Sequence, residues 1–196
     1  MAVDFYLKID SIDGESQDSK HKNEIEILSW SWGATNRGTA ATGGGMGQGK
    51  VAMRDIFFVK GIDKASAKLM LACASGQHIK SAVLVCRKAG KEQQEYLKLT
   101  FSDVLVSSYQ QGPGSQPSGT QRAGGEISFG EFPIPKHLAS SSPGLFAAAC
   151  AGSGVPNETF SLNFSKIEYG YKEQKADGTL GGAIQHHWSV KDNKGG

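Results

Sequence analysis

Apolar and polar side chains alternate along the first ten residues of the chain, which predicts an opening β-strand. Positions 3, 5, 7 and 9 are apolar and the positions between them are mostly polar, the period of a strand that buries one face. The same alternation recurs within 79–88, 96–109, 160–171 and 184–190. In two of these segments the parity of the apolar positions slips by one, which indicates a bulge or bend. Strands with repeated bulges can curl into a barrel, so the pattern predicts a mainly β fold.

A further strand is predicted in the stretch EIEILSWSWG, where two parities meet. Ile25 and Ile27 share one parity and the apolar residues from Leu28 onward take the other, so one strand with a bulge near Leu28 is expected. Ser29 and Ser31 then lie on the face opposite the two tryptophans. A small, hydroxylated face suits contact with water, and we expect it to be exposed.

One helix is predicted after the strand-forming residues of 51–59. Asp63 is a suitable N-cap, 64–75 form the body, and Gly76 is a suitable C-terminal stop. Leu69 and Cys73 lie on the shared apolar face at helical spacing. Cys73 is therefore expected to act as a small buried hydrophobe rather than as a reactive thiol.

A glycine-rich segment from 38 to 49 contains six glycines and few large side chains. It cannot bury enough apolar area to order itself, so it needs a partner surface. Residues 44–50 read G-x-x-x-x-G-K, but the P-loop requires Ser or Thr next and a helix to follow, and here Val51 opens a strand-forming run. Nucleotide binding is disfavoured. Two interpretations of this segment remain. It is either a surface loop or an arm that orders on a neighbouring subunit.

Composition narrows the class of protein. A net charge of +2 and the absence of a basic run disfavour nucleic acid as a partner. Three cysteines without a C-x-x-C pair suit free thiols in a reducing cytosol. No signal peptide and no long apolar run is present, so we expect a protein made inside the cell and not inserted into a membrane. The charged segment 15–23 is expected to be a solvated loop.

All six prolines lie between Gln111 and Asn157, which marks a compositional boundary within one domain of 196 residues. Inside this window, 112–125 has the composition of a linker, 126–132 is compatible with a short strand, and 142–152 has the signals of a short helix.

Catalytic constellations are not found in the sequence, and we expect neither enzymatic activity nor a cofactor or metal. His186 and His187 are neighbours on a predicted strand, so they point to opposite faces and cannot chelate one metal together. His186 is expected to be a core or interface residue. The carboxylates show no spacing that would pair them for acid–base chemistry.

Five segments carry a family resemblance in one order: MAVDFYLKID, EIEILSWSWG with the glycine-rich arm after it, IDKASAKLMLACASG, RKAGKEQQEYLKLTFSDVLVSSY and NETFSLNFSKIEYGYKEQKADG. Together they resemble the Hcp family, the haemolysin-coregulated tube proteins of the bacterial type VI secretion system. The resemblance covers about 1–111 and 157–192. It implies a β-barrel of two sheets with one flanking helix, which assembles as a homohexameric ring.

Further expectations follow from the resemblance. Rings stack into a tube within a contractile sheath and beneath a spike protein, and their lumen carries and protects effectors. The protein would thus start in the bacterial cytoplasm and be secreted by the type VI system without a signal peptide. Ser29 and Ser31 are the candidate lumen wall. The arm that would reach adjacent subunits comprises Arg37, Gly38, Thr39, Gly43, Gly44, Gly45, Met46, Gly47, Gln48 and Gly49.

The segment 112–155 departs from the family pattern, because an insertion of this length is atypical between these strands. It is expected to be an extended inserted loop region, either adding a contact with a partner at a ring face or edge or acting as a passenger without a role in assembly. One alternative function remains open at this point. A monomeric β-barrel could bind a small ligand or a glycan, with the glycine-rich segment as a lid.

Overall fold

The structure is a computed structural model, and it describes residues 3–36, 51–88, 94–111, 157–175 and 179–196. Its elements in chain order are β1 (Val3–Ile9), β2 (Ile25–Ile27), β3 (Ser29–Ser31), β4 (Ala34–Asn36), β5 (Val51–Met53), β6 (Ile56–Gly61), α1 (Ala65–Ser75), β7 (His78–Lys88), β8 (Gln94–Gln111), β9 (Asn157–Gln174), β10 (Leu180–Ser189) and β11 (Lys194–Gly195). The strand and helix expected within 112–155 lie outside the described residues.

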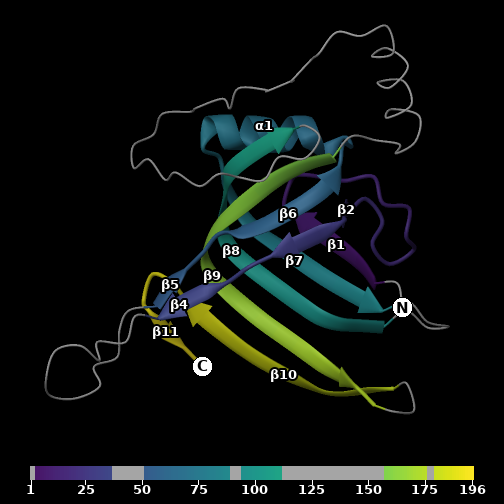
Figure 1. Cartoon of the computed structure of the whole chain (residues 1–196), viewed down its shortest axis with the longest axis vertical. Helices are drawn as coiled ribbons and strands as arrows, with labels where there is room; N and C mark the ends of the chain where they lie inside the picture. The colour runs from purple at the N-terminus through teal and green to yellow at the C-terminus, as the bar shows by residue number, and fades with distance from the viewer. Residues whose placement is uncertain (1–2, 37–50, 89–93, 112–156, 176–178) are drawn as a thin grey trace, which may run out of the picture.

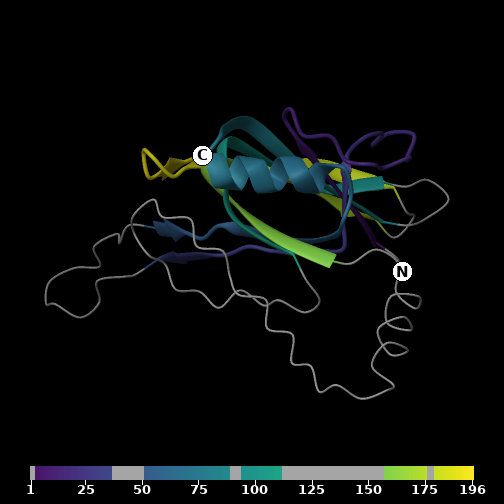
Figure 2. The ribbon, with the colours of Figure 1, turned by 90° about the horizontal axis from the view of Figure 1, so that it is seen from above.

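The larger sheet is antiparallel and has the order β11-β10-β9-β8-β7-β1-β2, with a branch at β9 (Figure 1). The second half of β9 pairs with β10, and its first half pairs with β6, which in turn pairs with β3. Seen from above, β3 and β6 form a layer in front of the rest of the sheet (Figure 2). The two layers enclose the core, and α1 lies across one end (Figure 1).

Segment 25–31 links the two layers, because its strands pair with β1 in the main order and with β6 on the branch. β2 pairs with β1, whereas β3 pairs with β6. At the junction the Leu28 N–H donates to the Val59 carbonyl at 2.8 Å. The predicted mainly β fold of two sheets with one flanking helix is confirmed among the described residues.

The expected single strand with a bulge near Leu28 is corrected by this arrangement. The change of parity marks the place where the chain leaves one partner strand for another. Leu28 is 58% exposed rather than on the core face, whereas Trp30 and Trp32 pack against the core. The period of two identified both strands, but it could not identify their partners.

The parity slips in β8 and β9 lie opposite each other. In β8 the buried apolar residues have odd numbers up to Phe101 and even numbers from Val104 onward. In β9 they have even numbers up to Phe164, and the next one is Ile167. The register pairs Phe101 with Ile167 and Val104 with Phe164. Asp103, between the two buried positions of β8, has φ 49°. Both long strands therefore bend at the same level, as the slips predicted, and so keep their apolar side chains on the core.

Helix α1 begins at Ala65, one residue later than predicted, and ends before Gly76 as predicted. The Asp63 carboxylate accepts a hydrogen bond from the Ala65 N–H at 2.8 Å, so it caps the helix as expected. Gly76 has φ 62°, the left-handed conformation of a helix C-terminus. Leu69 is fully buried and Cys73 is partly buried. Within the part of the chain that the structure describes, no helix is long and apolar enough to cross a membrane.

Candidate assembly surfaces

The two serines of β3 are exposed, as predicted. Cross-strand pairing joins Trp30 to Phe58, which is fully buried, so the neighbouring Ser29 and Ser31 point away from the core. They form part of an outer face that continues over β6 and β9. The exposure of these serines is confirmed, while their role as a lumen wall stays a prediction.

Hydroxyl and amide groups are linked on this outer face. Ser161 in β9 shares hydrogen bonds with Ser107 at 2.8 Å and with Ser108 at 2.6 Å. Ser107 also donates to Asp55 at 2.5 Å, and Asn163 donates to the same carboxylate at 2.8 Å. These side chains hold one another in place. The face is thus mixed, because these polar side chains lie beside the half-buried Phe57 and Val59, the cross-strand partners of Ser31 and Ser29.

The β4–β5 ribbon leaves the barrel at a narrow neck. The Arg54 N–H donates to the Gly33 carbonyl at 3.0 Å, and β4 and β5 beyond it pair only with each other among the described strands. All three residues of β4 are exposed. Figure 1 shows the ribbon projecting at the edge of the molecule. The ribbon flanks 37–50, so the predicted arm residues lie outside the described residues, between its two strands.

A buried polar cluster joins the start of α1 to the strands β6, β8 and β9. Lys60 and Glu158 have no exposed side-chain surface, and the Lys60 ammonium donates to Glu158 at 2.7 Å. It also donates to Asp63 at 2.8 Å and to the Ser66 hydroxyl at 3.2 Å. Tyr109 donates to the second oxygen of Glu158 at 2.7 Å. Burial and the adjacent carboxylate together raise the pKa of Tyr109.

This cluster was not predicted, although the sequence contains a signal for it. Lys60 continues the core parity of Ile56 and Phe58, and Glu158 continues that of Phe160 and the apolar residues after it. A charge at a core-facing strand position requires a partner of opposite charge. Lys60 and Glu158 are two such positions with opposite charges, 98 residues apart, so the sequence pattern could have predicted them as partners.

The segment expected to be a solvated loop, 15–23, is instead held against the barrel. The Arg87 guanidinium, 1% exposed, donates to Asp18 at 2.8 Å. The His21 ring is stacked on Tyr6 with centroids 4.5 Å apart, and its Nδ1–H donates to the Glu24 carboxylate at 2.8 Å. Charged residues of this loop therefore have structural partners, which local sequence could not indicate because Arg87 is distant in the chain.

The core-facing side of the larger sheet continues beyond the core onto β9 and β10. In one cross-strand row the register joins Leu99 to Tyr169 and Tyr169 to His186, and in the next it joins Leu97 to Tyr171. Directly paired side chains lie on the same face of a sheet. Exposure rises along the first row from 0% at Leu99 to 40% at Tyr169, and His186 is exposed. His186 is therefore not a core residue of the single chain.

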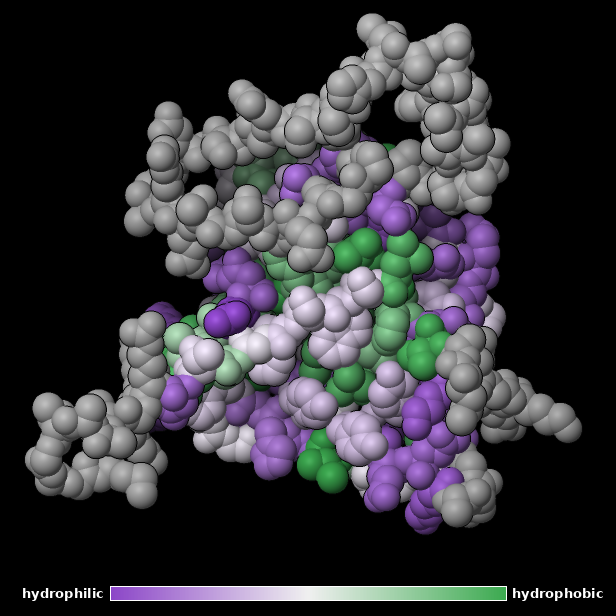
Figure 3. Space-filling model, viewed as in Figure 1, coloured by the Kyte–Doolittle hydropathy of each residue, from purple (hydrophilic) through white to green (hydrophobic). Residues whose placement is uncertain are grey.

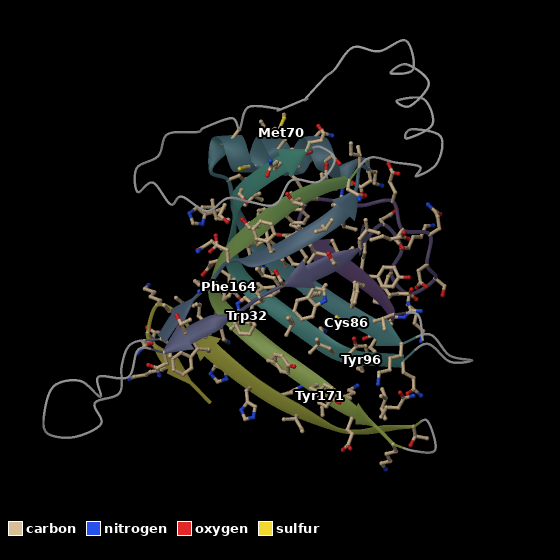
Figure 4. The ribbon with its side chains drawn as sticks, in the orientation of Figure 1. Trp32, Met70, Cys86, Tyr96, Phe164 and Tyr171 are labelled. Atoms are coloured by element: carbon tan, nitrogen blue, oxygen red, sulfur yellow. The ribbon has the colours of Figure 1, made fainter. Side chains whose placement is uncertain are left out.

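We call this surface the open inner face, and it consists of Tyr169, Tyr171, Ile184 and His186. Ile184 pairs with Tyr171 and is 55% exposed. In the view of Figure 4, Tyr171 lies lower than the front layer and lower than Tyr96 and Cys86. In the same orientation, the surface below the front layer consists mostly of residues of intermediate hydropathy, with hydrophilic ones beside them (Figure 3).

Among the described residues, no group of three or more His, Cys, Asp or Glu side chains could hold a metal ion. Cys73 and Cys86 are free thiols. Burial raises the pKa of Cys86 to about 12, so its thiol is a core group rather than a nucleophile. The expected opposite orientation of His186 and His187 is confirmed by their place as consecutive residues of β10.

Comparison with known proteins identifies relatives along the chain. Residues 6–118 match the family model described as "Type VI secretion system effector, Hcp". The chain is 39% identical over 195 residues to "Protein hcp1" of Pseudomonas aeruginosa, with 98% of each chain covered. Its fold matches a structure described as that of a type six secretion system protein, with a TM-score of 0.77, 29% identity and full coverage of both chains. It also matches Hcp1 from Salmonella typhimurium, with a TM-score of 0.64, 35% identity, and coverage of 100% and 99%.

Proposed function

The chain belongs to the Hcp family of type VI secretion tube proteins, and on that premise we propose that six copies form a ring and that rings stack into the tube. In this role the protein is a structural subunit without catalytic activity. It is made in the bacterial cytoplasm and leaves through the secretion system itself, without a signal peptide. The sheath, the spike protein and the effectors are its proposed partners.

The observation that carries the proposal is the β4–β5 ribbon. It leaves the barrel at the neck between Gly33 and Arg54 and has no neighbouring strand among the described residues. A two-stranded ribbon is at best marginally stable in water by itself. It flanks 37–50, which includes the arm residues that resemble the family's subunit contact. A neighbouring copy would supply the packing that this element lacks.

The outer face with Ser29 and Ser31 is the proposed lumen wall. Both serines are exposed, and the hydrogen-bonded hydroxyl and amide groups around Ser161 extend the same polar surface. Phe57 and Val59, the half-buried cross-strand partners of Ser31 and Ser29, lie on the same face, so the proposed wall combines small hydroxyl groups with two partly covered apolar side chains. This chemistry suits a channel that holds folded effectors and later releases them.

The segment 112–155 is proposed to be an inserted excursion at a ring face or edge that adds a contact with a partner. Gln111 at the end of β8 is paired with Glu158 near the start of β9, so the chain leaves and re-enters the barrel at one place. The competing interpretation is a passenger segment. Replacing 112–155 with a short Gly-Ser linker separates the two, since unchanged rings and unchanged secretion contradict a contact role and loss of either contradicts a passenger.

The mass of the purified chain in solution tests the ring. Light scattering is expected to give about six chains per particle, and negative-stain images are expected to show rings with six-fold symmetry. Replacing 38–49 with Gly-Ser-Gly should abolish the rings while the circular dichroism of the barrel is kept. A single chain at every concentration would contradict the proposal and favour a monomeric ligand-binding barrel. The barrel interior gives that alternative no support, because Phe58, Phe101 and Phe160 fill it with fully buried side chains.

The lumen wall is tested separately. Ser29→Glu combined with Ser31→Glu should leave the rings intact, because both positions are exposed, while reducing the protection of a co-expressed effector from proteolysis. Lys68→Glu, at an exposed position of α1 away from this face, is the matched control for added negative charge, and it should leave both properties unchanged. Loss of rings in the double serine variant would place these serines at a subunit contact instead.

A further inference from the structure

Helix α1 carries a second apolar stripe on the side that faces away from the barrel. We call it the outer stripe, and its residues have the spacing i, i+3, i+4 and i+7: Ala67, Met70, Leu71 and Ala74. Met70 is 47% exposed and Leu71 is 61% exposed, whereas Leu69 on the other side of the helix is fully buried. Figure 4 shows Met70 pointing away from the strands. A helix that is apolar on two sides is typical of an element with a layer on both sides of it.

The outer stripe is not shielded by the charged residue of α1. Lys68 is the single charged residue within 65–75, and its ammonium donates to the Ser11 carbonyl at 3.3 Å, in the loop after β1. Met70 and Leu71 are the one adjacent pair among the exposed large apolar residues that the structure describes. The alanines at both ends of the stripe leave room for the backbone of a second helix to come close. The outer stripe is therefore shaped to receive a helix.

The chain re-enters the barrel beside the start of α1. Asn157, the first residue of β9, pairs with Gly61 at the end of β6, shortly before α1 begins. The Lys60 ammonium bonds both to Glu158 and to Ser66 in the first turn of α1. The residues that come just before β9 in the sequence are consequently tethered close to the helix.

The sequence just before β9 contains the signals of a short apolar helix. Residues 142–152, which lie outside the described residues, have an N-cap serine, a proline at N1 and a terminal glycine. Their two large apolar side chains are Leu145 and Phe146, and three alanines follow. The linker 153–156 spans at most about 18 Å when fully extended, and α1 is about 16 Å long. The end of 142–152 thus stays within about one helix length of the start of α1.

We propose that 142–152 forms a helix that packs antiparallel on the outer stripe of α1. Its C-terminal end is held by 153–156 at the start of α1, so the two helices run in opposite directions. The two large apolar side chains of the segment are about 10 Å from that end along the helix axis, and those of α1 are about 8 Å from its start, so all four meet at one level. The contact forms within a single chain and does not depend on the ring.

This packing gives the insertion a fixed place on the subunit. With 142–152 against α1, the rest of the insertion is held at the end of the barrel that α1 crosses. A contact between the insertion and a partner then forms at that end, a consequence that rests on the proposed partner contact. A passenger segment would instead leave the outer stripe exposed to water.

Amide hydrogen exchange of the full chain tests the packing. In the wild type the amides of 145–151 are expected to exchange at least about tenfold more slowly than those of 118–125, because only the former are held in a packed helix. Leu71→Glu should remove this difference, since it places a charge in the centre of the outer stripe. Leu28→Glu is the matched control, because Leu28 is 58% exposed and lies between β2 and β3, outside α1. It should leave the exchange unchanged.

Oxidation of Met70 by hydrogen peroxide measures the same contact from the side of α1. A packed helix shields the thioether from the oxidant. Leu145→Glu should therefore speed the oxidation of Met70 severalfold, whereas Leu138→Glu, in the insertion but outside 142–152, should not. Neither position belongs to a barrel strand, so this measurement decides the matter if Leu71→Glu does not fold.

Three outcomes would overturn the inference, and the ring is judged separately by particle mass. Equal exchange at 145–151 and 118–125 in the wild type would show that the segment does not pack. Slow exchange that survives in folded Leu71→Glu would show that it packs on another surface. In the variant with Gly-Ser-Gly in place of 38–49, a single chain that keeps the slow exchange supports the inference. A single chain that loses it would assign the cover of the outer stripe to a neighbouring copy.

Discussion

The ammonium of Lys60 and the carboxylate of Glu158 lie 2.7 Å apart, and neither side chain has any surface exposed to water. Lys60 ends the core-facing row of β6, and Glu158 begins that of β9. The pair stands between the barrel and α1, where Asp63 and Ser66 complete the partners of the ammonium. It therefore connects the helix to the place where 112–156 leaves and re-enters the barrel.

Breaking this pair from one side should be costly, because the other charge would stay buried without its partner. We expect Glu158→Leu to lower the free energy of unfolding by about 3–5 kcal/mol. The double variant Lys60→Met with Glu158→Leu should recover much of that loss, since no isolated charge is left. Urea titration followed by circular dichroism measures both.

The exposed pair of Lys166 and Glu168 is the control for this comparison. Their side chains are 39% and 50% exposed, so solvent screens their attraction. Lys166→Met should change the free energy of unfolding by less than about 1 kcal/mol. Equal losses for Glu158→Leu and Lys166→Met would contradict the structural role assigned to the buried pair.

Asp18 should make the protein sensitive to acid. Burial by itself raises the pKa of Asp18, but hydrogen bonds from the Lys20 and His21 backbone N–H groups and from Arg87 outweigh it and hold the pKa below its ordinary value. A carboxylate with a lowered pKa contributes stability above its unfolded pKa of 3.8. That contribution is lost as the pH falls through the folded pKa.

Urea midpoints measured from pH 6 down to pH 2 test this expectation. Wild type should lose more stability than Asp18→Asn over the acidic part of the range, so the two curves should converge at low pH. Asp13→Asn, at an exposed position of the same loop, serves as the matched control and should follow the wild-type curve. Parallel curves for wild type and Asp18→Asn would contradict the assigned role.

Gly76 and Gly33 provide a matched pair for backbone strain. A Cβ atom at either position would meet nothing within 4 Å, but Gly76 has φ 62°. Gly76→Ala should therefore lower the free energy of unfolding by about 1 kcal/mol through strain alone. Gly33→Ala should have a smaller effect. Thermal melts of the two variants decide the matter, and a larger loss at Gly33 would show that crowding matters more than conformation.

The two described cysteines should differ in reactivity towards iodoacetamide. Cys86 is fully buried and its pKa is raised to about 12, so almost no thiolate forms near neutral pH. Burial also raises the pKa of Cys73, which is only partly buried. Peptide mapping should find Cys73 labelled in the native protein and Cys86 only after unfolding. Equal labelling rates at the two positions would contradict this order.

Local pattern was sufficient for much of this fold, because strands and helices are short-range periodicities. The alternation at 3–9 and the bends shared by β8 and β9 could be inferred from parity, and Asp63 and Gly76 from their preferences at helix ends. These features depend on a residue and its close neighbours in the chain. The exposure of Ser29 and Ser31 followed in the same way.

Other features required the three-dimensional fold. The change of partner at Leu28 depends on where β1 and β6 lie, and the burial of Lys60 depends on a residue 98 positions away. Exposure at Ile184 depends on how far the front layer extends. The order of side chains along the chain decided which segments are strands, since the side chains of a strand repeat every two residues. Tertiary structure decided which strands meet and which apolar face stays open, because those depend on contacts between distant segments.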